Sequence, residues 1–168
     1  MRSFRFKIFF LLIIVFFLQS SGYSQEKPTK FTSNNSLSAG LFIGKYTFGG
    51  ELSFGYGKMY KDAFNLGVSF GIGYKQFSAY GGQGKNLYFP LYANVGYYIS
   101  INEFVDLITK IECGYAFYSG TDNTTLHLIP QLGLRFNKAK SIKPYFVIGY
   151  RSDVEEYSSI LLRFGISF

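Results

Sequence analysis

The chain contains few of the residues on which catalysis and metal binding usually depend. Its 168 residues include one cysteine, Cys113, one histidine, His127, and no tryptophan. A single cysteine excludes a disulfide within the chain, and we interpret Cys113 as a small apolar residue of a strand face. No His/Cys/Asp cluster has the spacing of a metal site. The glycines at 67–73 and 81–84 are not followed by the strand-to-helix turn of a phosphate loop. The sequence therefore implies no cofactor.

A long apolar run is present only near the N-terminus. A basic start at residues 2–7 precedes an uninterrupted apolar run at 8–18, and residues 19–24 are mostly small or polar. This order is typical of an export signal peptide, and the run is shorter than the ~17–25 residues of a spanning helix. We expect residues 1–24 to be removed by cleavage between Ser24 and Gln25.

Neither sign of charge dominates the chain after residue 24. The signal peptide holds three of the seventeen Lys and Arg and none of the ten Asp and Glu, so the formal net charge falls from +7 to +4 after cleavage. No Lys/Arg-rich run and no RNA-binding aromatic motif is present. These observations argue against nucleic acid as a partner.

Apolar residues are spread by alternation. After an irregular lead-in at 25–35, eight segments show the two-residue period of a strand, with apolar residues on one face and small or polar residues on the other. The segments are 37–44, 48–57, 64–75, 87–99, 105–117, 126–136, 144–151 and 160–168. Loops are expected at 78–86, 119–125 and 152–158, and tighter turns elsewhere. Pro90 and Pro130 lack a ladder donor, so we expect a bulge or a strand start at each.

The final segment alternates without a break up to its last residue. Its apolar row suits a lipid-facing strand that closes a barrel, since an exposed apolar edge invites aggregation. The row comprises Ile160, Leu162, Phe164, Ile166 and Phe168.

Two barrel types alternate in this way. A soluble barrel of the lipocalin kind keeps its apolar face inside and needs charge outside. Here the opposite face is largely Gly, Ser, Asn and Ala, which suits the crowded interior of a narrow barrel. Aromatics also collect near strand ends and aliphatics near the middles, as in the girdles of membrane barrels. The pattern favours a barrel with lipid outside.

The chain resembles the small outer-membrane β-barrel proteins of the OmpX, OmpA-domain and opacity type, and the final apolar row resembles the signal read by the outer-membrane assembly machinery. The resemblance implies an all-β fold, an eight-stranded antiparallel up-and-down transmembrane barrel over residues 36–168. Residues 25–35 would be a flexible periplasmic segment. It also implies a cell outer-membrane location, lipid and the assembly machinery as partners, and a monomer. It implies little about function.

Inward charges are the only candidates for a site. Glu51, Lys110, Glu112 and Arg163 are expected near mid-height, with Arg163 reaching over Gly40 towards Glu51. Paired charges in a narrow lumen satisfy one another, which predicts a side-chain plug. The plug predicts a non-enzymatic barrel with a structural or surface-interaction role through its outer loops. One alternative is a narrow solute or ion channel.

The remaining polar groups give weaker predictions. We expect Lys75 and Arg151 near the outer rim, and Asp106 and Arg135 near the inner one, solvated or facing headgroups. His127 is interpreted as a polar inward or rim residue. The second alternative function is a lipid-modifying enzyme. In it, Ser119 or Thr125 would be the nucleophile and His127 would act beside it.

Overall fold

The computed structural model describes residues 31–79, 82–119, 124–137, 141–153 and 158–168. The predicted signal peptide, its cleavage site and residues 25–30 lie outside this part of the chain. No helix in the described residues is long and apolar enough to cross a membrane.

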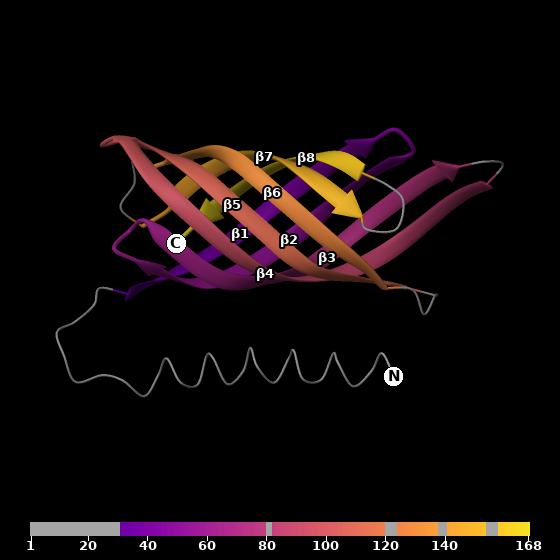
Figure 1. Ribbon diagram of the computed structural model, residues 1–168, viewed down its shortest axis with the longest axis horizontal. Coiled ribbons are helices and arrows are strands. Elements are labelled where there is room, and N and C mark those ends of the chain that lie inside the picture. The colour runs from indigo at the N-terminus through magenta and orange to yellow at the C-terminus, as the bar shows by residue number, and fades with distance from the viewer. Residues whose placement is uncertain (1–30, 80–81, 120–123, 138–140, 154–157) are drawn as a thin grey trace, which may run out of the picture.

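Eight strands form a closed antiparallel barrel in which each strand pairs with the next and β8 pairs with β1 (Figure 1). The eight-stranded up-and-down fold predicted from the alternation is confirmed. The strands are β1 (Phe31–Gly44), β2 (Thr47–Tyr60), β3 (Phe64–Ala79), β4 (Gly82–Asn102), β5 (Val105–Tyr118), β6 (Thr124–Phe136), β7 (Lys143–Asp153) and β8 (Ser158–Ser167).

Two segments predicted to be irregular belong to strands. β1 begins at Phe31, so 31–35 is part of the barrel and not a flexible lead-in, because its backbone pairs with the end of β2 from Phe31 opposite Tyr60 onward. The expected loop at 78–86 is mostly a hairpin, with the backbone of Ala79 opposite Gly82. In both places ladder pairing overrides a polar or glycine-rich composition.

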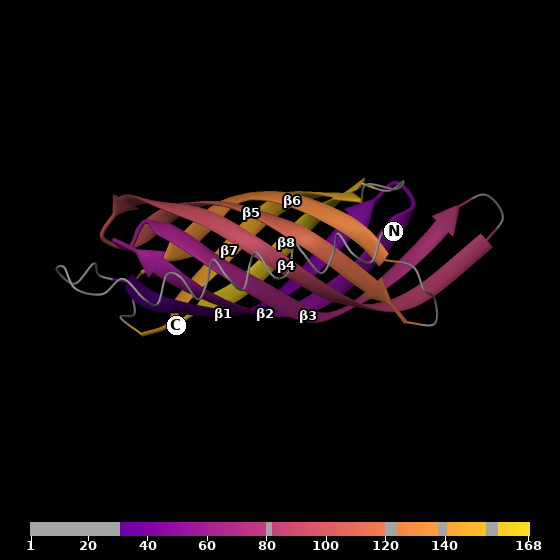
Figure 2. The ribbon, with the colours of Figure 1, turned by 60° about the horizontal axis from the view of Figure 1, so that its bottom comes forward.

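The two ends of the barrel differ. Phe31 and Phe168 lie at one end, here called the terminal end, together with the turns at 61–63 and 103–104 (Figures 1 and 2). Lys61 and Asp62 have φ values of 51° and 55°, and Ala63 N–H donates to Tyr60 O at 3.1 Å, which closes a tight turn within this three-residue connection. At the opposite end, here called the loop end, the β3–β4 hairpin projects beyond the other strands.

The two strand prolines interrupt a ladder without shifting its register. β3 and β4 pair at Phe70–Leu91 and again at Gly73–Tyr88, and the ladder is interrupted between these two pairs, at Pro90. β6 and β7 show the same gap around Pro130. The expectation of a bulge or strand start is therefore wrong. The missing N–H removes local bonds while the other pairs hold the strand in place.

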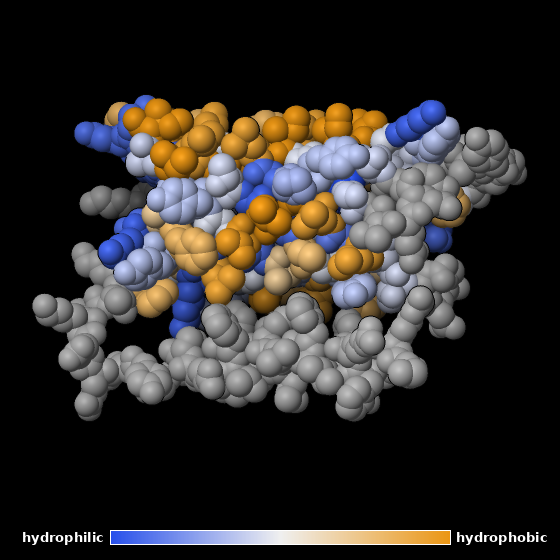
Figure 3. All heavy atoms as spheres, viewed as in Figure 1, coloured by the Kyte–Doolittle hydropathy of each residue, from blue (hydrophilic) through white to orange (hydrophobic). Residues whose placement is uncertain are grey.

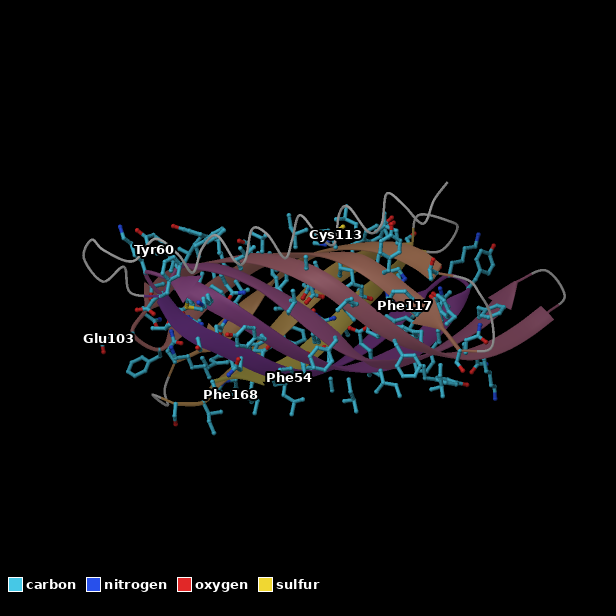
Figure 4. The ribbon with its side chains drawn as sticks, turned by 90° about the horizontal axis from the view of Figure 1, so that it is seen from below. Phe54, Tyr60, Glu103, Cys113, Phe117 and Phe168 are labelled. Carbon is cyan, nitrogen blue, oxygen red and sulfur yellow. The ribbon has the colours of Figure 1, made fainter. Side chains whose placement is uncertain are left out.

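The outer surface carries many of the large apolar residues. Leu52, Ile111 and Leu132 are 50–59% exposed at mid-strand, and hydrophobic side chains cover much of the surface in view (Figure 3). Exposed aromatics occur near both ends: Phe31, Tyr97, Phe104, Phe136 and Phe168 at the terminal end, and Phe48, Tyr74, Phe89, Phe117 and Tyr150 at the loop end. Figure 4 places Tyr60 and Phe168 at one end and Phe117 at the other, with Cys113 on the outside. This distribution is that of lipid-facing barrels.

The inner face combines small residues with a few large ones. Phe42, Tyr88, Tyr92, Ile129 and Leu161 are buried and pack together inside the barrel. The large rings lie over glycines, since the ring of Tyr88 occupies the space that a Cβ on Gly73 would need. The interior is a packed core, as a narrow barrel requires.

Candidate functional site

The four charged residues predicted at mid-height meet inside the barrel. Arg163 on β8 bonds to Glu51 on β2 through Nη2 and to Glu112 on β5 through Nη1, the latter at 2.8 Å. Lys110 Nζ lies 2.7 Å from the other oxygen of Glu112. Arg163, Glu51 and Glu112 are at most 4% exposed. The two ion pairs of Arg163 join strands across the lumen, and the Lys110–Glu112 pair lies within β5.

Register explains how Arg163 reaches Glu51. On β1, Gly40 is paired with Arg163 on one side and with Glu51 on the other. A residue without a side chain therefore separates the two charges, and the guanidinium extends over it.

Arg151 belongs to the same cluster, although its position along the chain predicted the outer rim. It is 2% exposed, and its Nη2 lies 3.4 Å from Glu51 Oε2 and 3.1 Å from Tyr88 Oη. Its guanidinium also lies over the ring of Phe42, 4.5 Å from the centroid. A long side chain on a tilted strand reaches deeper than its place in the strand indicates. The alternation had indicated only that Arg151 points inward.

Two tyrosines and the histidine complete the cluster. Tyr88 Oη donates to Glu51 Oε2 at 2.9 Å, and Tyr92 Oη lies 2.7 Å from His127 Nδ1. Arg151 Nε donates to the same nitrogen of His127 at 3.2 Å. From here on, the lumen cluster means Glu51, Tyr88, Tyr92, Lys110, Glu112, His127, Arg151 and Arg163. The alternation predicts that both tyrosines point inward and fill volume, and the structure adds their hydrogen bonds.

His127 is a buried member of this cluster, with 0% of its surface exposed. Its Nδ1 is engaged by Tyr92 and Arg151, which is the environment of a structural histidine. Ser119, one of the two nucleophiles considered, donates its backbone N–H to Leu87 O at the end of β5. In the described residues, no group of three His, Cys, Asp or Glu side chains could hold a metal ion.

The remaining inward charges are buried as well. Asp106 and Arg135 form a two-bond ion pair, with Oδ2 of Asp106 3.0 Å from Nε and 2.6 Å from Nη2 of Arg135. Both are at most 4% exposed, so the expectation of solvated rim charges is wrong for this pair. Lys75 is 9% exposed and donates to Tyr118 Oη at 3.4 Å inside the loop end. Packed neighbours at each end enclose these side chains.

A small polar recess occupies the terminal-end half of the lumen. Three amides form a row across its wall, with Asn34 Nδ2 donating to Asn65 Oδ1 at 2.9 Å and Asn65 Nδ2 donating to Asn94 Oδ1 at 3.1 Å. Lys110 and Tyr145 line it further in. The lumen is thus hollowed at the terminal end and filled at the lumen cluster.

The last strand presents its apolar row outward. Ile160 and Phe164 are 54% and 63% exposed, and the backbone of Phe168 exchanges two hydrogen bonds of 2.9 Å with Asn35. Leu162 and Ile166 are partly exposed on the same face. The row proposed as an assembly signal is therefore accessible from outside the barrel along its whole length.

No protein-family model and no curated protein sequence matches the chain.

Solved structures match it in fold. Ail, the attachment invasion locus protein of Yersinia pestis, in complex with the heparin analogue sucrose octasulfate, is similar at a TM-score of 0.53 and 18% identity, over 80% of this chain and 95% of Ail. Neisserial surface protein A is similar at a TM-score of 0.52 and 14% identity, over 82% of this chain and 97% of that protein. The outer membrane enzyme PagL is similar at a TM-score of 0.51 and 14% identity, over 79% of this chain and 97% of PagL.

At these identities the likeness concerns the fold, and one fold carries different activities. One of these neighbours is named for attachment and invasion and another is an enzyme. In fold, the chain is one of the small eight-stranded antiparallel β-barrels found among bacterial outer-membrane proteins.

Proposed function

We propose that the chain is a non-enzymatic integral outer-membrane barrel whose lumen is closed by side chains and whose role is structural or surface-interacting. The observation that carries the proposal is the lumen cluster. Arg163 and Arg151 extend into the lumen from β8 and β7 and share Glu51 on β2. Tyr88 and Tyr92, at most 1% exposed, fill the space beside them.

Several features support the membrane location. Exposed aliphatic side chains surround the middle of the barrel, with aromatics towards both ends. A face of this kind would be poorly solvated in water and is stable against lipid. With the terminal end in the periplasm, the β3–β4 hairpin would project from the cell.

The projecting hairpin is the part of the barrel best placed to meet another surface. β4, with 21 residues, and β3, with 16, are the longest strands. We propose that this hairpin, with the other connections of the loop end, carries the surface interaction. The polar recess at the terminal end faces away from that surface.

Conductance in planar lipid bilayers tests the closed lumen. We expect the purified barrel to insert without producing steady single-channel currents, because the lumen cluster leaves no wide aqueous path. Large, stable currents that disappear when Arg163 or Lys110 is neutralised would establish the narrow-channel alternative and overturn the proposal. Arg163→Gln and Lys110→Gln keep comparable side-chain volume, and Lys45→Gln, between β1 and β2, serves as the control.

Lipid analysis tests the absence of enzymatic activity. We expect lipid A and phospholipids to have the same composition in cells that make the wild-type protein and in cells that make His127→Gln. A lipid change that requires His127 would establish the enzyme instead. Comparable amounts of folded barrel in both strains are the necessary control.

A further inference from the structure

Two buried arginine–carboxylate pairs differ in the strands that they connect. Arg135 on β6 pairs with Asp106 on β5, and the two residues are direct register partners in one hairpin. This contact requires only that β5 and β6 meet. It can therefore form before the barrel is complete.

Arg163 makes contacts of another kind. Its strand, β8, is hydrogen-bonded to β7 and β1, whereas its carboxylate partners lie on β2 and β5. Neither partner strand is a neighbour of β8. Both contacts therefore need the curvature of the closed barrel, and the contact with Glu51 also needs the pairing of Gly40 with Arg163 across the β1–β8 seam.

The β1–β8 seam is a shorter ladder than the one on the other side of β1. The β1–β8 ladder runs from Ser36 to Gly44 on β1, and Asn35 adds the two bonds to Phe168. The β1–β2 ladder runs from Phe31 to Ile43. An opened seam would also separate Arg163 from Glu51 and Glu112, so that Glu51 would keep only Arg151 and Glu112 only Lys110 as ion-pair partners. Losing one partner of a buried ion pair is costly.

We infer that Arg163 locks the closing seam of the barrel, because its ion pairs with Glu51 and Glu112 exist only when β8 is paired with β1. The lock is a property of folding and holds whether or not the lumen passes ions. It gives β8 two faces with different tasks: the outer one meets lipid, and the inner one secures closure.

Backbone hydrogen exchange of the protein purified in detergent tests this inference, since local opening exposes the amides of the ladder that opens. In Arg163→Met we expect exchange to rise about tenfold or more at the β1–β8 amides between residues 36–44 and 159–167. The β5–β6 amides should change much less. In the matched control Arg135→Met the pattern should reverse, with faster exchange near Asp106 and little change at the seam.

A conservative variant separates the lock from the loss of a large side chain. Arg163→Lys keeps a long cationic side chain, but one ammonium cannot reproduce both contacts of the guanidinium fork, so its seam exchange should lie between that of the wild type and that of Arg163→Met. Where Arg163→Met does not fold, the comparison of Arg163→Lys with the wild type provides the test. Unchanged seam exchange, or an equal rise in every strand, would overturn the inference. Either result leaves the conductance test of the closed lumen unaffected.

Discussion

At the scale of single residues, the inside of this barrel depends on pairs in which one partner is large and the other is glycine. Tyr88 lies over Gly73 and reaches Glu51 with its hydroxyl at 2.9 Å. Since Arg151 also bonds to Tyr88, the ring cannot move away without disturbing the lumen cluster. A small residue is needed at Gly73 because a neighbour fills its space.

We expect Gly73→Ala to lower the free energy of unfolding by about 1–3 kcal/mol, as overpacking of a fixed core does. Gly96→Ala is the matched control, because the nearest atom to its added Cβ would be 3.5 Å away, an ordinary contact. Urea titrations of the two variants in the same detergent check this. Equal midpoints for both would contradict the role assigned to Tyr88.

At the scale of elements, β8 is the strand that the sequence describes best and the barrel needs most. Its outward residues form the apolar row, and its inward Arg163 reaches two other strands. Phe168 continues the row beyond the strand and bonds through its backbone to Asn35. The row and the lock lie on opposite faces, so they can be altered separately.

We expect Phe168→Ala to reduce the amount of protein assembled in the outer membrane several-fold, on the proposal that the row is an assembly signal. Phe136→Ala removes an aromatic of similar exposure, 43% against 51%, from the terminal end of β6 and should leave assembly unchanged. Quantitative immunoblots of membrane fractions provide the measurement. Equal assembly of both variants would mean that the row has no signalling role.

At the scale of the whole molecule, many large apolar side chains lie on the outer face of the sheet and charged side chains lie on the inner face, the reverse of a water-soluble protein. Aliphatic side chains such as Leu52 and Ile160 are more than half exposed, while Glu51, Glu112 and Arg163 are enclosed. Such an arrangement is stable only with lipid outside, because water would solvate the wrong face.

Membrane fractionation combined with gel electrophoresis checks this arrangement. We expect the protein in the outer-membrane fraction, with faster migration before heating than after it, because the closed barrel withstands detergent until it is heated. A soluble product whose mobility heating does not change would contradict the membrane barrel. Gly73→Ala should lower the temperature at which the mobility changes.

The amino-acid sequence determined the strand pattern, the inward and outward faces and the closing strand. These follow from the two-residue period, which each residue expresses locally. The strand ends predicted from the sequence were less accurate than the strand pattern. The start of β1 at Phe31, for example, depends on backbone pairing with β2. The predicted signal peptide stays a prediction.

Only the tertiary structure decided which inward residues meet. Glu51, Lys110, Glu112 and Arg163 were chosen by their positions along separate strands, and the closed barrel brings them together. Arg151 joins them, and Asp106 and Arg135 form a separate buried pair. The physical reason is that contacts across a lumen depend on tilt, register and side-chain reach in the closed barrel, and none of these is a property of one strand alone.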